Sequence, residues 1–384
     1  MYFKKESLRY EKDLDLDDTF KFDELPETGK SAGLLITLAS PLSGGQHYAC
    51  TDFDDKIRMI DWFSKVQVIV DGKRPLKDLS GPVAQALSYW NTGKTVPDAL
   101  KDRSIGEDRC FIPIAWGRRL YDPEYYLNWE DYASIELDLV NTMTDPPFDS
   151  ATITIDNIKI MDEGALPASK GIFQERIWRE FTTVQNKTEY FKLPIGNKLR
   201  RLILRCVPDL AAAAPFRRIR SFYHLAEEVK LALKGGDEIC FEGYGEALME
   251  QNILEFPHMP RTGGLTLGLT DGYGVRTGIG KRLAQSIAHS EIATSLTERN
   301  YGIYPYTDDI MCIFSDSSTN AYLTWQAMGL GYNNTLALLF DQLGIENLID
   351  TDEKAPINLE IKTENHADAA AGVVEIILSE LVPK

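Results

Sequence analysis

Adjacent acidic side chains are the first candidates for chemistry in this chain of 384 residues. Such pairs occur at Asp54 and Asp55, Glu130 and Asp131, and Asp308 and Asp309. Two carboxylates about 5 to 9 Å apart are enough for glycoside hydrolysis, and β-sandwiches host such enzymes. Because the chain has 58 acidic residues, adjacent pairs also arise by chance. The sequence therefore favours solvated loops or turns over catalysis at these positions.

Other catalytic and cofactor patterns are absent from the sequence. The glycine-rich tract of residues 263–282 fits neither a phosphate loop nor a dinucleotide loop, which favours a flexible loop over a ligand loop. Neither zinc-type spacing nor a CxxC pair occurs among the histidines and cysteines, which are His47, His224, His258, His289, His366, Cys50, Cys110, Cys206, Cys240 and Cys312. We predict that the chain is not an enzyme and has no catalytic, cofactor-binding or metal-binding residues.

Two further clusters could bind a partner. The aromatic tract YDPEYYLNWEDY, residues 121–132, could stack sugars or bases, but its composition favours a packed corner or a subunit contact. The basic cluster combines KLRRLILR with FRRIR at residues 216–220. Arg201 and Arg205 flank Ile203 on one strand face and could form ion pairs with a neighbouring subunit, and a satisfied salt-bridge face is favoured over local contact with nucleic acid.

Composition limits the partners and the compartment. The formal net charge of −17 argues against a general role in coating phosphate backbones, and we predict no sequence-specific binding of nucleic acid. No apolar run approaches the ~18 residues of a membrane span, and the first residues lack the apolar stretch of a signal peptide. Scattered, unpaired cysteines indicate synthesis in a reducing cytoplasm.

The elements around these candidates are repeated along the chain. Leu34, Ile36 and Leu38 match Leu202, Leu204 and Cys206 at an offset of 168, so each strand has one apolar face. At an offset of 163, KVQVIVDG of residues 65–72 matches EVKLALKG of residues 228–235. A third match places Gly81 on Gly243 in two short helical segments. Three matches in one order indicate a duplicated β domain.

The other segments also favour β structure. Short β-branched or aromatic runs bounded by turn residues occur at 109–117, 132–140, 150–160, 188–194, 309–316, 334–340 and 372–378. Helical spacing is confined to pieces such as residues 280–296. We predict a mainly β chain of two tandem antiparallel jelly-roll sandwiches with a few short helices, divided near residues 161–171 into residues 1–170 and 171–384.

This pattern resembles the double jelly-roll major capsid proteins of tailless icosahedral viruses, the lineage of tectiviruses and adenoviruses. The resemblance rests on the two Leu-Pro-turn-strand openings and on the layout of residues 111–140. It is specific over residues 25–160 and 186–255, and the second half departs from the layout after Phe256.

The resemblance implies a structural subunit of the virion. Such proteins form homotrimers, which are pseudo-hexagonal capsomers that contact neighbouring capsomers and minor or vertex proteins, often over an internal membrane. The alternative from the residues is a carbohydrate-binding or glycan-hydrolysing double β-sandwich, with Trp116, Trp129 or the nearby tyrosines lining a groove beside Glu130 or Asp131. A receptor-binding or accessory structural protein of a phage is a third hypothesis.

Overall fold

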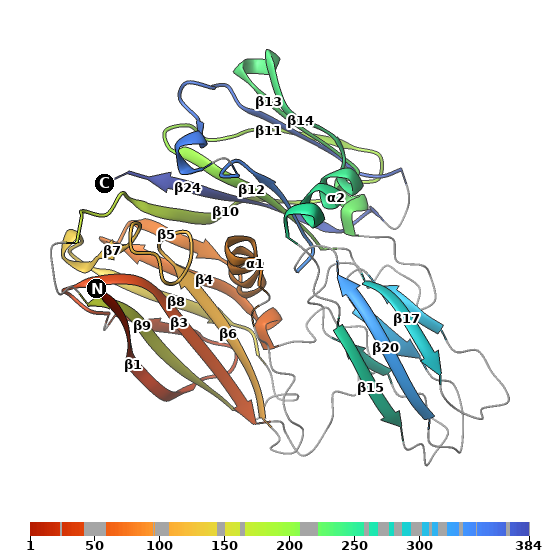
Figure 1. The fold of residues 1–384 in the computed structure, drawn as a ribbon, viewed down its shortest axis with the longest axis horizontal. Coiled ribbons are helices and arrows are strands. Elements are labelled where there is room, and N and C mark those ends of the chain that lie inside the picture. The colour runs from red at the N-terminus through yellow and green to blue at the C-terminus, as the bar shows by residue number, and fades with distance from the viewer. Residues whose placement is uncertain are drawn as a thin grey trace.

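A computed structural model gives the fold of the chain (Figure 1). It describes residues 1–383 except 24, 42–58, 95, 97–106, 144–149, 162–165, 208–221, 257–260, 268–275, 280–285, 293–301, 307–308, 314–320, 330–332, 343 and 366–368. Strands hold 53% of the residues and helices are few, so the predicted mainly β class is confirmed.

The first roll is a sandwich of two antiparallel sheets. One sheet has the order β1-β9-β3-β6, and the other begins with the order β2-β8-β4-β5. The strands are β1 (Tyr2–Leu14), β2 (Thr19–Phe22), β3 (Lys30–Pro41), β4 (Phe63–Val70), β5 (Arg74–Leu79), β6 (Glu107–Ala115), β7 (Leu127–Asn128), β8 (Ile135–Asn141) and β9 (Ala151–Met161). The helical elements are η2 (Met59–Trp62), α1 (Gly81–Thr92) and η3 (Trp129–Asp131).

The second roll repeats this order. Its sheets run β10-β24-β12-β21 and β11-β23-β13-β14. The strands are β10 (Ile172–Thr182), β11 (Thr188–Lys192), β12 (Lys198–Val207), β13 (Glu228–Leu233), β14 (Glu238–Tyr244), β21 (Thr335–Leu339), β22 (Ile349–Asp350), β23 (Asn358–Lys362) and β24 (Val373–Val382). The helical elements are η4 (Phe222–Ala226), η5 (Lys234–Gly236), α2 (Gly245–Glu255) and η6 (Ile345–Asn347). Strand for strand, β1–β6, β8 and β9 correspond to β10–β14, β21, β23 and β24, so the predicted duplication is confirmed in topology.

Irregularities in the strands recur at equivalent places. A β-bulge lies between Ser31 and Gly33 in β3, and another lies at the matching place in β12, between Leu199 and Arg201. The first strands of the rolls repeat a bulge in the same way, after Ser7 in β1 and after Ile177 in β10. Bulges re-aim side chains and interrupt strand pairing locally. Their shared positions fix the correspondence of the rolls residue by residue.

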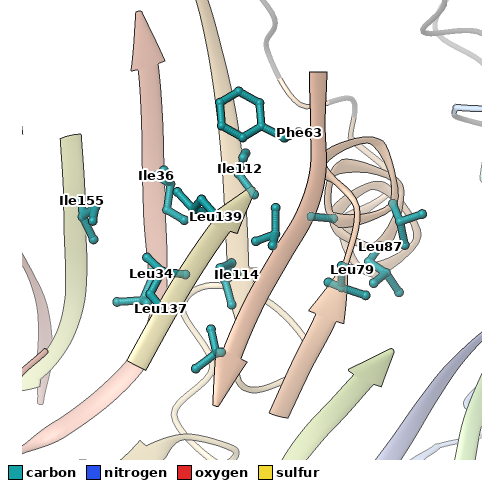
Figure 2. Close-up of a cluster of buried hydrophobic side chains, with 14 of the residues drawn as sticks. Leu34, Ile36, Phe63, Leu79, Leu87, Ile112, Ile114, Leu137, Leu139 and Ile155 are labelled. Carbon is teal, nitrogen blue, oxygen red and sulfur yellow. The ribbon is translucent and has the colours of Figure 1, made fainter. Parts of the chain in front are cut away.

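Each roll encloses its own hydrophobic core. Leu34 and Ile36 of β3 face Leu137 and Leu139 of the opposing sheet, and the helix α1 closes one end (Figure 2). In the second roll the inward residues Leu202, Leu204 and Cys206 are fully buried. Alternate residues of a strand share a face, so the predicted inward faces of β3 and β12 are both confirmed.

The two helices begin at matching glycines. A Cβ on Gly81 would lie 2.6 Å from the carbonyl oxygen of Ile60, and one on Gly245 would lie 2.3 Å from that of Ala226. Each helix start therefore packs directly against the 3₁₀ turn before the preceding strand pair, where only glycine fits. The sequence match was right in order but two residues wrong, because Gly81 corresponds to Gly245 rather than to Gly243.

The second roll carries extra strands between α2 and β21. They form two three-stranded sheets, β15-β20-β17 and β16-β19-β18, and the first of these extends away from both rolls in Figure 1. The strands are β15 (Arg261–Leu267), β16 (Arg276–Ile279), β17 (Ser286–Ile292), β18 (Gly302–Tyr306), β19 (Asp309–Ile313) and β20 (Ala321–Gly329).

Two predictions for this insertion were wrong. The segment expected to be helical, residues 280–296, contains β17, which pairs with β20 from Ser286 to Ile292. The glycine-rich tract, expected to be a loop, contains β16 and all but the first two residues of β15. Pairing with a distant strand overrides a weak local helical pattern.

The two rolls share a continuous sheet. The first roll's β5 pairs in parallel with the second roll's β10, at Lys77 with Glu175 and at Asp78 with Arg176. The sheet therefore runs β2-β8-β4-β5-β10-β24-β12-β21 across both rolls. In the part of the chain that is described, no helix has the length and apolar character needed to cross a membrane.

Candidate functional site: the junction between the rolls

The predicted acidic pairs do not form a described catalytic site. Asp54, Asp55 and Asp308 lie outside the described residues, and Asp309 begins β19. Glu130 and Asp131 lie in η3. A groove of about 920 Å³ adjoins Glu130, and its other acidic lining residues are Asp23, Glu27 and Glu136. Over the described ranges, no group of three or more His, Cys, Asp or Glu side chains is placed to hold a metal ion.

The histidines are placed only in part. His47, His258 and His366 lie outside the described residues, and His289 lies on β17. The Nδ1 atom of His224 lies 3.1 Å from a carboxylate oxygen of Glu364. His224 thus lies beside a carboxylate of the same chain.

The two tryptophans of the glycan hypothesis offer no surface to a sugar. Trp116 and Trp129 are both fully buried, and their rings pack edge to face with centroids 6.2 Å apart. Trp116 Nε1 donates a hydrogen bond to Ser31 Oγ at 2.9 Å. Stacking on a sugar needs an exposed ring face. Of the aromatic side chains that line the groove beside Glu130, Trp129 is buried and Tyr132 is half-buried.

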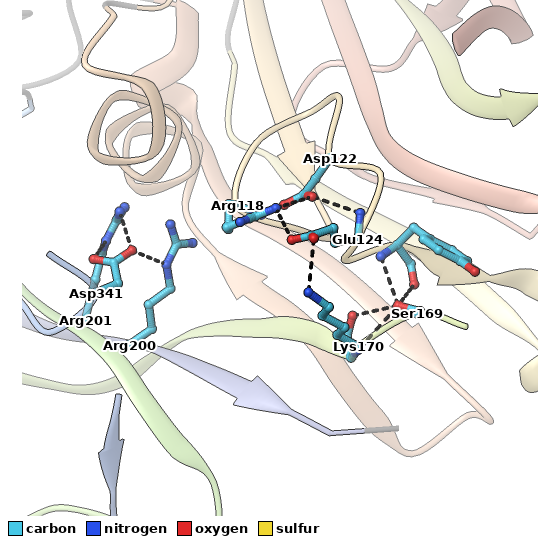
Figure 3. Close-up of polar contacts among 10 residues, drawn as sticks. Arg118, Asp122, Glu124, Ser169, Lys170, Arg200, Arg201 and Asp341 are labelled. Carbon is cyan, nitrogen blue, oxygen red and sulfur yellow. Dashed lines mark hydrogen bonds and ion pairs between the residues drawn. The ribbon is translucent and has the colours of Figure 1, made fainter. Parts of the chain in front are cut away.

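The aromatic tract is a packed corner tied by ion pairs. Arg118 Nε and Nη2 donate to the two carboxylate oxygens of Asp122 at 2.7 and 2.9 Å (Figure 3). Glu124 accepts from Arg118 at 2.8 Å and from Lys170 at 3.0 Å. Burial alone would raise the pKa of Asp122, but hydrogen bonds from Arg118 and two backbone N–H groups hold that pKa below its usual value. Lys170 immediately precedes the second roll, so this network ties the linker to the first roll.

The tyrosines of the tract support the same interpretation. Tyr125 packs on Phe173 of β10 with ring centroids 5.3 Å apart, and the hydroxyl of Tyr126 donates to the carbonyl oxygen of Pro167 at 2.8 Å. Both rings are buried, whereas Tyr121 is about half exposed. The expected packed corner is confirmed, and it packs against the second roll.

The basic cluster on β12 forms ion pairs within the chain. Arg200 Nε and Arg201 Nη2 both donate to Asp341 Oδ2, at 2.7 and 2.9 Å (Figure 3). Arg205 pairs with Glu375 at 3.0 Å. The ion-pair interpretation of the cluster is therefore confirmed for β12, and residues 216–220 lie outside the described residues.

In this ion cluster, burial and the charge of the oppositely charged partner shift the pKa of each group in opposite directions. Burial and the neighbouring Arg200 lower the pKa of Arg201 to about 10, against the attraction of Asp341. Burial would raise the pKa of Asp341, but the charges of the two arginines outweigh it and keep that pKa below its usual value. Arg201 also donates to Asn91 at the end of α1 at 2.8 Å, so the cluster belongs to the junction between the rolls.

A buried lysine lies at the centre of the junction. Lys77 Nζ lies 2.7 Å from Glu175 Oε2 and donates to the carbonyl oxygen of Phe173 at 2.9 Å. Both charged side chains are almost completely buried. Burial lowers the pKa of Lys77, and the charge and hydrogen bond of Glu175 oppose that shift. Each charge is thus the necessary partner of the other in the low-dielectric interior.

The end of helix α1 contacts the second roll's strands β12 and β21. Trp90 is fully buried, and its Nε1 donates to Thr335 Oγ1 at 2.9 Å. Asn333 Nδ2 donates to the carbonyl oxygen of Pro82 at 2.7 Å. Second-roll residues that join the first roll's hydrophobic cluster are Ile172, Ile203, Ala337, Ile377 and Val382. The junction therefore combines apolar burial, hydrogen bonds and an ion pair.

Sequence reasoning missed most of this junction. Lys77 and Glu175 are 98 residues apart, and nothing in the local pattern links them. The same is true of Trp90 and Thr335. One usable signal was the arginine-rich face of residues 198–205, where charge on an otherwise apolar strand predicted ion pairs.

Comparison with known proteins places the fold. The sequence matches no protein-family model and no curated protein. The structure is similar to the major capsid protein of STIV, Sulfolobus Turreted Icosahedral Virus, with a TM-score of 0.59 and 10% identity over 100% of this chain and 98% of that one. It is similar to the major capsid protein P2 of bacteriophage PM2 with a TM-score of 0.51 and 9% identity, over 99% of this chain and 98% of that one. It also resembles a protein of the PBCV-1 virus capsid, with a TM-score of 0.55 and 8% identity over 98% of this chain and 92% of that one.

The chain has the double jelly-roll fold. The resemblance predicted from the sequence is thus confirmed for the architecture, including the part beyond Phe256 where the sequence pattern was lost. In the double jelly roll of this chain, the junction is the surface at which the two rolls pack against each other.

Proposed function

We propose that the chain is a viral major capsid protein, a structural subunit of an icosahedral virion. The observation that carries this proposal is the full-length match of both rolls, in one order and one chain, to the capsid proteins of three viruses. A fold admits many functions, so the proposal also rests on the site. The junction shows that one roll can bind another through combined apolar, hydrogen-bond and ion-pair contacts, which suits a protein whose work is assembly.

The finer features of the proposal follow from the resemblance. The chain forms a homotrimer, a pseudo-hexagonal capsomer that packs against neighbouring capsomers and minor or vertex proteins. It is made in the host cytoplasm, and its role is structural rather than enzymatic. Residues 1–170 and 171–384 are the two domains, a division supported by the separate hydrophobic clusters of the two rolls.

Oligomeric state tests the proposal directly. Size-exclusion chromatography with light scattering is expected to give a trimer of the 43.2 kDa subunit, and negative-stain microscopy to show threefold particles or shells. A chain that stays monomeric at every concentration and under every assembly condition, or that binds glycans as a monomer, would overturn it.

A further inference from the structure

The junction joins one surface of the first roll to one surface of the second roll. Because the rolls are duplicates, each of these surfaces has a counterpart on the other roll that the internal junction does not use. In the described sheets, β5 at the edge of the first roll pairs with β10 of the second. The corresponding edges are β14 of the second roll and β1 of the first, and each pairs with one strand alone. We propose that β14 and α2 of one copy dock on β1 and the outer face of the β3–β6 sheet of a second copy, repeating the internal junction. This inference rests on the proposed function and names the surface by which the trimer forms.

Corresponding residues can be read from the shared irregularities. Tyr2 pairs with Met161 at the end of β9, and Ile172 pairs with Val382 at the end of β24. In both strands the bulge begins five residues later. Tyr2 therefore corresponds to Ile172. The helices correspond from Gly81 and Gly245, and the ninth residue after each is Trp90 in α1 and Leu254 in α2.

Exposed apolar side chains occupy the positions that the internal junction buries. Trp90 is 1% exposed, whereas its counterpart Leu254 is 86% exposed. Ile172 is 6% exposed, whereas its counterpart Tyr2 is 49% exposed. Large apolar side chains held in water cost free energy that burial against a partner recovers. Both halves of the unused junction thus present apolar anchors where the internal junction has them.

The receiving face offers a matching apolar contact. Trp90 binds Thr335, which pairs with Arg205 of β12. The counterpart of Arg205 in β3 is Thr37, whose partner in β6 is Phe111. Phe111 lies between the buried residues Cys110 and Ile112, so its side chain faces outward, and it is only half-buried. Repetition of the junction places Leu254 of one copy against Phe111 of the next.

Charge is also complementary at a second corresponding pair. Asn333 donates to the carbonyl oxygen of Pro82 in the internal junction. By the same correspondence, Asn333 matches Arg109 on β6, and Pro82 matches Glu246 in the first turn of α2. Opposite charges that face each other across an interface favour the correct register over others. The contact joins two different surfaces, so it is heterologous and forms a ring when its rotation closes.

A pair of charge substitutions tests the contact. Leu254→Lys and Phe111→Glu are each expected to weaken trimer association about tenfold or more, because each puts an unpaired charge into an apolar contact. The double variant is expected to associate more tightly than either single variant, since the lysine then meets the glutamate. Mass photometry across a concentration series, with thermal melting to confirm folding, measures this.

A matched control separates this surface from general surface charge. Ile195, in the turn between β11 and β12, is 60% exposed and lies on none of the elements of the proposed contact. Ile195→Glu is expected to leave trimer association unchanged. If the wild type forms trimers but neither Leu254→Lys nor Phe111→Glu weakens their association, the inference is wrong and the capsomer proposal stands. The same holds if the double variant associates no more tightly than the single variants. A wild-type protein that never associates would overturn the proposed function itself.

Discussion

Removal of the Lys77 ammonium group is the sharpest perturbation of the junction. In Lys77→Met the Glu175 carboxylate stays buried and loses its ion-pair partner at 2.7 Å, while Ser379 Oγ remains near its other oxygen at 3.3 Å. Breaking one side of a buried pair typically costs about 3–5 kcal/mol. Because the Lys77 hydrogen bond to the Phe173 carbonyl oxygen is lost too, we expect a loss in the upper part of that range.

The double variant Lys77→Met, Glu175→Leu distinguishes pairing from packing. It replaces both charges by apolar groups of similar volume, and such replacements are often neutral or stabilising. We therefore expect it to recover most of the lost free energy of unfolding.

Urea unfolding of all variants provides the assay, followed by fluorescence and circular dichroism. The buried tryptophans Trp90 and Trp116 flank the junction and report its separation. Two rolls need not unfold in one step, so each transition is fitted separately. Lys230→Met removes a lysine that pairs at 3.0 Å with Glu242 in a solvent-exposed setting, and we expect no measurable change. A Lys77→Met protein as stable as the wild type, or a double variant as unstable as the single, would refute the buried-pair account.

Other substitutions probe the helix start, the ion cluster and the second core. Gly245→Ala would place a Cβ 2.3 Å from the Ala226 carbonyl oxygen, and we expect a loss of about 1–3 kcal/mol in urea unfolding. Asp341 has a pKa below its usual value, so its ion pairs contribute stability above the unfolded pKa, and that stability is lost as the pH falls through the folded pKa. In thermal melts between pH 7 and pH 3, the melting temperature of Asp341→Asn is expected to fall less with decreasing pH than that of the wild type. An equal fall in both proteins would contradict this account. Leu204→Ala empties a fully buried position and should cost about 2–5 kcal/mol, whereas a change within 0.5 kcal/mol would exclude a tight core there.

Interior strands were predictable because their burial imposes a pattern. The inward residues of β3 and β12 alternate strictly, since a shift of one residue would turn the apolar set toward water. Edge strands lack that constraint. β1 has the sequence YFKKESLRYEKDL, in which seven of 13 residues are charged, and charged side chains are typical of edges that must not aggregate. β1 therefore gave no strand signal, although it forms a long pairing with β9.

The functional surface was less predictable than the fold. The insertion between α2 and β21 hid its strands, because β17 follows an apolar spacing that also fits a helix and is decided by pairing with β20. The junction itself depends on contacts such as Lys77 with Glu175, which exist only after both rolls have folded. A single lysine in RPLKDL carries no sign of burial in the sequence.

Because the two rolls are duplicates, the chain must select the correct pair of strand edges for the junction, and the charges at the junction make that selection. Two similar rolls offer two similar pairs of edges, so β5 could accept β1 as well as β10. The counterpart of Lys77 is Phe241 and that of Glu175 is Lys5. Lys5 already pairs with Asp156 at 2.7 Å, so a wrong pairing of β5 with β1 would bury Lys77 beside Lys5 without a carboxylate of its own, and an unpaired buried charge costs about 3–5 kcal/mol. The correct internal pairing is the one that neutralises Lys77, and divergence at these two positions thus directs β1 toward β14 of another copy.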